Sequence, residues 1–340
     1  VAPASQKCGA TPSAAALNLE WEKSMSMKKV IITGPTGAVG VSLIEELIAH
    51  DIYVTAVCRE NSQNITEIPQ SPFVKVLECN LDQLQSLERK LPADYDVFYH
   101  FGWDGSFGAA RMDLSTQTKN IQYSLDAVEL AKKLGCKVFI GAGSQSEFGH
   151  VNGVLHPDTP CNPDNGYGIA KLAAGQMTRL KCKEYGIRHN WVRILSMYGP
   201  HDKAHTMVMS TILKMLDGQR VQFTKGDQIW DYIYNKDAAR AFRMIAEQGK
   251  DGAVYCFGSG KTRRLREYIE AIRDAVDPQI ELGIGELPYY PNQVMHLEAD
   301  ISSLTADTGF VPEYSFEDGI QETVVWAQKN FRKANDAKSN

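Results

Sequence analysis

Between Lys28 and Gly199, short apolar runs alternate with longer amphipathic stretches, and this rhythm constrains the fold more than any other feature of the sequence. The apolar runs predict strands at 28–33, 52–58, 73–79, 96–101, 136–142 and 189–199. The stretches between them predict helices at 38–51, 82–91, 115–135 and 165–186. Strands that alternate with helices at this spacing form βαβ units with right-handed crossovers. The sequence therefore predicts an α/β fold with a doubly wound parallel sheet.

After Gly199 the alternation becomes irregular. The stretch at 231–249 begins as a strand and continues as a helix, whereas 265–276 and 316–331 are amphipathic helices. Prolines break up the segments between them. This pattern predicts a smaller C-terminal lobe of mixed α/β structure.

These patterns suggest a domain organisation. We expect the doubly wound domain to span 27–199, with the chain re-entering it around 231–258, and the smaller lobe to take up most of 200–335. Residues 1–26 are rich in Ala and Ser and precede a clean strand signal. We interpret them as a tag, a linker or another non-native extension.

The composition excludes several classes of protein. The 340 residues carry a net charge of −5, so the basic surface of a nucleic-acid-binding protein is not expected. No apolar run approaches the roughly 18 residues of a membrane-spanning helix. Seven cysteines occur without a CxxC pair, which favours reduced thiols and a cytoplasmic protein. We expect no metal site.

The first predicted strand runs into the sequence TGPTGAVG, which has the pattern GxxGxxG. Glycines in such a turn let the backbone approach a pyrophosphate, and the N-terminus of the following helix faces the phosphates. Because the motif follows a strand and opens a helix, it predicts a dinucleotide-binding (Rossmann) domain. The residues expected at this phosphate site are Gly34, Thr36, Gly37, Ala38, Val39 and Gly40.

The end of the second strand bears on the choice between NAD and NADP. An acidic residue there would bind the ribose 2′-hydroxyl of NAD, whereas an arginine accommodates the 2′-phosphate of NADP. The sequence has Cys58 at this place, followed by Arg59 and then Glu60. These residues favour NADP(H). NAD(H) stays possible, with Glu60 on the ribose and Arg59 stacked on the adenine.

Two later strand ends predict further cofactor contacts, because ligands of open α/β sheets bind at the carboxyl ends of the strands. Asn80 and Leu81 follow the third strand, and we expect them to contact the adenine. His100, Phe101 and Gly102 end the fourth strand, and we expect them beside the cofactor phosphates and ribose.

Tyr167 and Lys171, in the sequence YGIAK, lie four residues apart at the start of a predicted helix and therefore share one face. A cation close to a phenol lowers the pKa of that phenol, which lets the tyrosine act as an acid or base near neutral pH. The same spacing also fits a surface tyrosine and a solvated lysine. The upstream glycine motif and Ser144 at a strand end favour the catalytic interpretation.

In order, GxxGxxG, HFGW, GSQSEFG, YxxxK and RILSMYGP resemble the extended short-chain dehydrogenase/reductase family, most closely its nucleotide-sugar epimerase/dehydratase branch. The resemblance covers about residues 27–330. It implies a Rossmann domain with a substrate lobe, an NAD(P) cofactor, a nucleotide-sugar substrate and a homodimer. It further implies that Tyr167 is the acid/base, that Lys171 binds the nicotinamide ribose and tunes Tyr167, and that Ser144 hydrogen-bonds the reacting oxygen. Asn120 resembles the buried structural Asn of the family.

The sequence departs from this family at the residues after Ser144. Sugar 4,6-dehydratases of the family carry an Asp–Glu pair there, which moves protons during elimination. This chain has Gln145 and Ser146 instead, and Glu147 is displaced by one residue. Elimination chemistry is therefore not expected.

Two more departures concern the substrate. Ser196 replaces an Asn of the family, and Trp230 replaces an Arg that often meets the nucleotide diphosphate. Arg193 is one cation that could compensate. The residues expected to contact the substrate are Ser144, Gln145, Ser146, Arg193, Ser196 and Trp230.

Three functions fit these residues. The first is a reductase that transfers hydride to C4 of a nucleotide-linked 4-keto sugar, with Tyr167 as the acid. The second is a nucleotide-sugar 4-epimerase, which uses the same residues and keeps NAD tightly bound. The third is a non-catalytic Rossmann binding protein, which the intact set of Ser144, Tyr167 and Lys171 argues against.

Overall fold

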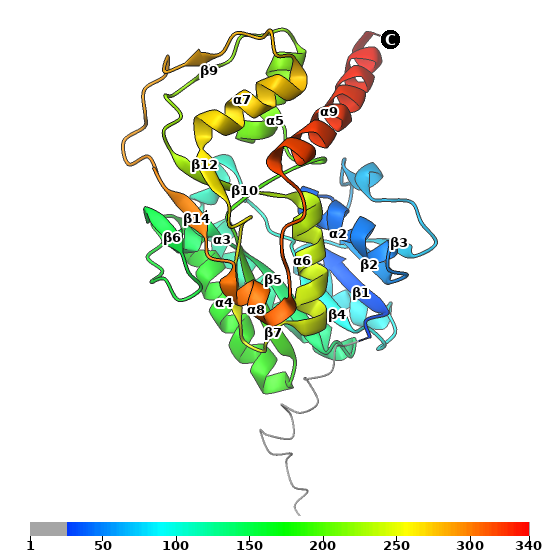
Figure 1. Ribbon diagram of the computed structural model, residues 1–340. Coiled ribbons are helices and arrows are strands. Elements are labelled where there is room, and N and C mark those ends of the chain that lie inside the picture. Colours follow the sequence, from blue (N-terminus) through cyan, green and yellow to red (C-terminus); the bar gives the residue numbers. More distant parts are fainter. Residues whose placement is uncertain (1–25, 340) are drawn as a thin grey trace, which may run out of the picture.

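Seven parallel strands form the central sheet of the computed structural model, which describes residues 26–339 (Figure 1). They are β1 (Lys29–Thr33), β2 (Tyr53–Cys58), β3 (Val74–Glu78), β4 (Val97–His100), β5 (Val138–Ser144), β7 (Arg188–Ile194) and β11 (Val254–Phe257). Their order is β11-β7-β5-β4-β1-β2-β3. The chain winds outward in both directions from β1, which confirms the predicted doubly wound Rossmann sheet. The predicted extension at 1–26 lies, except for Ser26, outside the described residues.

Helices cover both faces of this sheet. One face carries α2 (Ala38–Ile48) and α6 (Asn235–Gln248), and the other carries α3 (Leu114–Lys133), α4 (Gly166–Tyr185) and the 3-10 helix η2 (Leu81–Arg89). In the second half of the chain, α6 packs beside α2 and β11 pairs with β7. Segments far apart in the sequence therefore build one layered domain.

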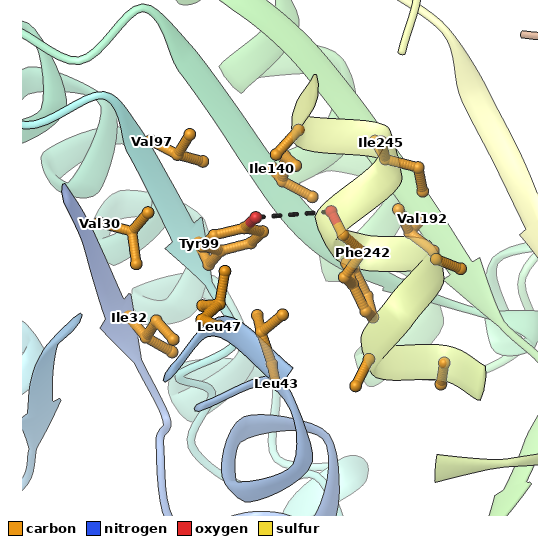
Figure 2. Packing of buried hydrophobic residues seen from close by; sticks show 14 of the residues in the cluster. Val30, Ile32, Leu43, Leu47, Val97, Tyr99, Ile140, Val192, Phe242 and Ile245 are labelled. Carbon is orange, nitrogen blue, oxygen red and sulfur yellow. Dashed lines mark hydrogen bonds between the residues drawn. The ribbon is translucent and has the colours of Figure 1, made fainter. Parts of the chain in front are cut away.

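Successive side chains of a strand point to opposite faces of the sheet, so two hydrophobic cores form. Ile32 and Tyr99 belong to the core under α2 and α6, whereas Ile31 and Phe98 belong to the core under α3. A buried phenol needs a hydrogen-bond partner. The hydroxyl of Tyr99 donates to the backbone carbonyl of Phe242 on α6 at 3.5 Å, as Figure 2 shows.

The predicted strand at 189–199 is wrong in one respect, because the structure divides it. Its first part is β7 of the central sheet, whereas β8 (Ser196–Tyr198) pairs with β10 (Ile229–Tyr234), which also pairs with β12 (Thr262–Arg264). Leu195 stands between them, and its backbone N–H donates to the carbonyl of Phe257 in β11. Since only Leu195 separates the two parts and no glycine or proline lies between them, the sequence pattern does not reveal the change of sheet.

The second lobe lies beyond the carboxyl ends of the central strands (Figure 1). Its helices α5 (Met207–Leu216), α7 (Leu265–Val276) and α9 (Phe316–Ser339) pack around the β8–β10–β12 sheet. The remaining short elements are η1 (Ile65–Glu67), η3 (Gly108–Arg111), η4 (Gln145–Glu147), β6 (Gly153–Leu155), β9 (Gln222–Phe223), β13 (Gly283–Ile284), β14 (Leu297–Ala299) and α8 (Ser302–Thr308). None of the helices within 26–339 has both the length and the apolar character needed to cross a lipid bilayer.

Candidate active site

The turn between β1 and α2 depends on two of its glycines for close packing. Gly34 has a φ of +70°, and a Cβ there would lie 2.7 Å from the backbone nitrogen of Gly102. A Cβ on Gly40 would lie 2.5 Å from the carbonyl oxygen of Gly34. In contrast, a Cβ on Gly37 would meet only that same oxygen, at 3.9 Å. Gly34 and Gly40 therefore serve the turn, whereas Gly37 leaves open space in front of the helix.

The N-terminus of α2 has properties that suit a phosphate group. Its N-cap residue is Gly37, which offers no side-chain hydrogen bond to the first backbone N–H groups of the helix. These N–H groups and the helix dipole attract an anion. They face a cavity of about 510 Å³, a volume within the range of small-molecule and cofactor sites.

Most of the predicted cofactor residues line this large cavity. They are Gly34, Thr36, Gly37, Ala38, Val39, Gly40, Arg59, Leu81, Phe101, Gly102, Tyr167 and Lys171. Ser144 lines it as well. The cavity therefore joins the glycine turn to the Tyr–Lys pair, as a site for a dinucleotide requires, and these residues fit an NAD(P) cofactor.

The wall beside the end of β2 is basic rather than acidic. Arg59 and Ser62 line the cavity, whereas Glu60 does not. The side chain of Glu60 accepts a hydrogen bond from Nδ2 of Asn80 at 3.2 Å, and its backbone N–H donates to Oδ1 of the same residue. One oxygen of the carboxylate that could bind a ribose hydroxyl is therefore engaged by Asn80.

Two predicted cofactor contacts, Asn80 and His100, do not line the cavity. The amide of Asn80 is occupied by Glu60. The ring of His100 is buried and hydrogen-bonds Thr33 at 2.9 Å and Ser124 at 3.2 Å. Burial lowers the pKa of His100 to about 3, so the ring is neutral. Both side chains hold strand ends in place and do not meet the cofactor space.

Tyr167, Ser144 and Trp103 meet at the carboxyl end of β5. Tyr167 lies in the first turn of α4, where Asn165 caps the helix by accepting from the N–H of Gly168 at 2.9 Å. Its phenol hydrogen-bonds Ser144, and its ring meets Trp103 edge-on at a centroid distance of 6.0 Å. All three side chains line the large cavity. The structure thus brings the predicted serine and tyrosine together.

Lys171 is buried one turn further along α4. Its Nζ donates to the carbonyl oxygen of Ala142 at 2.6 Å and lies 3.7 Å from the ring centroid of Trp103. Burial lowers the pKa of Lys171 to about 7. Its Nζ is 5.8 Å from the ring centroid of Tyr167.

The pKa of Tyr167 is raised, chiefly because the phenol is buried. The hydrogen bond from Ser144 and the positive charge of Arg111 act in the opposite direction. We expected Lys171 to lower this pKa. In the structure, Arg111 is the nearer cation, with its Cζ 4.3 Å from the ring centroid of Tyr167.

Ser144 is held by a buried carboxylate. Glu147 accepts hydrogen bonds from the N–H of Ser144 at 2.8 Å and from Nε1 of Trp191 at 2.9 Å. It also forms an ion pair with Arg193 at 2.8 Å. Glu147 is fully buried and lines neither the large cavity nor the smaller one described next. Its role is to fix the strand end that carries Ser144.

A second cavity of about 220 Å³ begins at the residues after Ser144. Gln145, Ser146 and Trp230 line it, and Ser196 accepts a hydrogen bond from Nε1 of Trp230 at 2.9 Å. Oε1 of Gln145 is buried and has no hydrogen-bond partner within 26–330.

Arg193 does not belong to this group, which corrects the prediction that it contacts the substrate. It is 4% exposed, pairs with Glu147 and donates to the carbonyl of Pro157 at 3.0 Å. A guanidinium that is buried on a carboxylate is not available to a diphosphate.

Four residues of the site are not among those predicted from the sequence: Trp103, Arg111, Asp202 and Lys203. Trp103, Asp202 and Lys203 line the large cavity, and Arg111 stacks on Tyr167. Trp103 ends the HFGW stretch, whereas Arg111, Asp202 and Lys203 belong to no recognisable motif. Asn120, expected to be a buried structural residue, is buried and binds the backbone of Asp104 in both directions.

Known proteins provide a comparison for this site. The model of the NAD dependent epimerase/dehydratase family matches residues 30–258. A dTDP-glucose 4,6-dehydratase of Salmonella typhimurium is 23% identical over 351 residues and covers 92% of this chain and 96% of its own. The low-salt glycan biosynthesis protein of Haloferax volcanii is 25% identical and covers 87% of this chain and 97% of its own.

Solved structures share the fold. UDP-N-acetylglucosamine 4-epimerase of Methanobrevibacter ruminantium, in complex with UDP-N-acetylmuramic acid, has a TM-score of 0.81 at 24% identity and covers 90% of this chain and 100% of its own. A dTDP-glucose 4,6-dehydratase of Streptomyces venezuelae with NAD bound has a TM-score of 0.79 at 18% identity and covers 90% of this chain and 98% of its own. Since the family match extends from β1 through β11 and includes both the glycine turn and the Tyr–Lys pair, the chain belongs to the NAD dependent epimerase/dehydratase family.

Proposed function

We propose that this protein is an NADPH-dependent reductase that transfers hydride to C4 of a nucleotide-linked 4-keto sugar. The observation that carries the proposal is the contrast around Ser144. The serine meets Tyr167 at the large cavity, but the next two residues, Gln145 and Ser146, are not acids. The site can exchange a proton at a carbonyl oxygen, and the two residues after Ser144 carry no acid pair for elimination.

Tyr167 and Ser144 have separate roles in the proposed reduction. When bound, the reduced dinucleotide supplies the hydride, whose electron pair forms the new C–H bond. The carbonyl π electrons move to oxygen, and the hydroxyl of Tyr167 gives that oxygen its proton. Ser144 hydrogen-bonds the same oxygen and orients it toward Tyr167. The product is a hydroxyl at C4.

Dehydration would require a carboxyl group next to C5 and C6 of the sugar. Gln145 cannot ionise, and Ser146 is a poor base at neutral pH. Glu147 carries the only carboxylate among residues 144–147, and its two oxygens already accept from Ser144, Trp191 and Arg193. We therefore place this protein apart from the dehydratases among its relatives.

The proposed preference for NADPH rests on Arg59. This arginine lines the cavity at the end of β2, where a 2′-phosphate would lie, and the carboxylate of Glu60 is held by Asn80 instead. A guanidinium recognises phosphate well, because its donors match the oxygens of the anion.

A nucleotide-sugar 4-epimerase is the second candidate. The fold is shared with 4-epimerases at TM-scores of 0.79 and 0.81, and the same Ser144 and Tyr167 would serve both activities. An epimerase regenerates its cofactor in every turnover and retains it, whereas a reductase releases the oxidised cofactor each time.

This difference supplies the test. The purified protein is denatured and the released nucleotides are identified by chromatography, in parallel with titration of the native protein by NADPH and NADH. We expect a site that is largely free of nucleotide after purification and that binds NADPH more tightly than NADH. Release of about one NAD per chain would contradict the reductase and favour the epimerase.

A further inference from the structure

Arg111 is the nearer of the two cations that lie close to the ring of Tyr167. It ends η3, the short helix between β4 and α3, and its guanidinium Cζ lies 4.3 Å from the ring centroid. Nη2 donates to Oγ of Ser146 at 2.6 Å, and Nη1 donates to the carbonyl of Ser106 at 3.5 Å. Ser106 lines the large cavity and Ser146 the smaller one, so Arg111 is hydrogen-bonded to one residue of each cavity.

The guanidinium is held by neutral partners. No carboxylate within residues 26–330 pairs with Arg111, although twenty ion pairs occur there. Its positive charge is therefore not cancelled by a neighbouring side chain. Its two hydrogen bonds fix its plane against Tyr167, which gives the charge a defined position.

Two other charged groups face Tyr167, one from α4 and one from η4. Lys171 is further away, at 5.8 Å from the ring centroid, and its Nζ is directed to Ala142 and Trp103. Glu147 is negative and opposes ionisation of the phenol, but its oxygens are engaged by Arg193 and its other donors. Arg111 is the nearer of the two cations.

We propose that Arg111 is a positioning residue that stabilises the ionised phenol of Tyr167 and so takes over the electrostatic role that the YxxxK motif assigns to Lys171. The inference rests on the proposed acid/base role of Tyr167. When Tyr167 gives its proton to the sugar oxygen, a phenolate forms beside the guanidinium, and a fixed cation at that distance lowers its energy. The raised pKa that burial gives Tyr167 is thereby partly offset by Arg111.

The link to Ser146 adds a positional element. The hydroxyl of Ser146 holds one arm of the guanidinium and also lines the smaller cavity. A sugar bound in this cavity would contact the same Ser146 hydroxyl that accepts the hydrogen bond from Arg111. The acid/base group and the substrate space therefore share one hydrogen-bonded connection.

The test measures the phenol directly and needs no substrate. The full chain is labelled with tyrosine ¹³C at Cζ, and the signal of Tyr167 is identified by its loss in Tyr167→Phe. The signal is followed from pH 6 to 12. We expect Arg111→Gln to raise the pKa of Tyr167 by about one unit, a tenfold loss of phenolate at a given pH, and Arg111→Lys to restore at least half of the shift.

Lys119→Gln is the matched control, because it removes an exposed positive charge from α3 that does not contact Tyr167. It should leave the titration unchanged. Ser146→Ala keeps the charge of Arg111 and loosens it, so we expect a smaller upward shift. This variant keeps the inference testable if Arg111→Gln fails to fold.

Three results would overturn the inference. They are an unchanged titration in Arg111→Gln, a larger shift in Lys171→Met than in Arg111→Gln, and a phenol that stays protonated to pH 12 in the unaltered protein. Because the titration is independent of turnover, it remains decisive even if the released nucleotide identifies an epimerase. An absence of any oxidoreductase activity would contradict the proposed function without changing this readout.

Discussion

Lys171 is a residue whose place in the site costs stability. The side chain is 4% exposed, and burial lowers its pKa to about 7 from an ordinary value of 10.5. Between these two values the unfolded chain binds a proton that the folded chain does not. The free energy of unfolding therefore decreases as the pH is lowered from 10.5 to 7.

Lys171→Met removes this penalty. After allowance for the lost hydrogen bond to Ala142, we expect the variant to be more stable than the parent by about 2 kcal/mol at pH 7. The difference should shrink toward zero near pH 10. Urea unfolding at both pH values measures it, with Lys119→Met as the exposed control. A variant that is less stable at pH 7, or a gap that is the same at both pH values, would show that the buried charge is not the cause.

At the scale of an element, the glycines between β1 and α2 have two different roles. Some are required for backbone packing, and one leaves space for the cofactor phosphates. Gly34 and Gly40 are constrained by the backbone, whereas Gly37 meets nothing closer than 3.9 Å. Its φ of −86° and ψ of 163° also suit an alanine. The three glycines of one motif should therefore respond differently to the same substitution.

We expect Gly37→Ala to fold with the stability of the parent, within about 0.5 kcal/mol, and to lose at least tenfold in NADPH affinity, because the new methyl group enters the phosphate space. Gly34→Ala should instead lose about 2 kcal/mol or more of stability, since its left-handed φ and the contact with Gly102 both oppose a Cβ. Thermal unfolding and fluorescence titration distinguish the two effects. Equal destabilisation by both substitutions would contradict this division.

The sequence could predict the features of the fold and the site that depend on residues close together in the chain. The alternation of strands and helices, the glycine turn and the pairing of Tyr167 with Lys171 on one helix face are all local patterns. The 82–91 stretch already marks the limit of such patterns, because it forms the 3-10 helix η2 (Leu81–Arg89) in place of an α-helix.

Contacts that depend on the folded chain could not be predicted in this way. Arg111 contacts Tyr167 only because η3 lies close to the start of α4 in the folded chain. No sequence pattern around Arg111 indicates that contact. Glu147 likewise finds Trp191 and Arg193 on β7, more than forty residues away. Arg193 was assigned to the substrate for the same reason, because its ion pair is invisible in the sequence.

At the scale of the whole molecule, one buried carboxylate and one interlobe hydrogen bond join the two lobes. Asp231 of β10 is fully buried and accepts from the N–H groups of Ser259, after β11, and Ala299, in β14. His201, which follows β8, hydrogen-bonds Glu67 of η1 at 2.6 Å. These contacts join segments of the two lobes.

The outer face of α3 and α4 bears on the predicted homodimer. Leu114, Ile169, Met177 and Leu180 are between 43% and 66% exposed there. On α4, Ile169, Met177 and Leu180 share one side of the helix, since spacings of eight and eleven residues place all three within an arc of about 80°. The two helices pack side by side, as Figure 1 shows, so that a second copy related by a two-fold axis would complete a four-helix bundle.

A substitution on this face tests the homodimer. We expect light scattering after size exclusion to give twice the chain mass of 37.8 kDa for the parent and a value near 37.8 kDa for Leu180→Glu. The new carboxylates would be buried against each other across the two-fold axis, which costs several kcal/mol. Val325→Glu, at a 56% exposed position on α9, is the matched control and should stay dimeric. A parent protein with the mass of a single chain would contradict the dimer. A Leu180→Glu variant that keeps twice the chain mass would show that the dimer interface does not involve this face of α3 and α4.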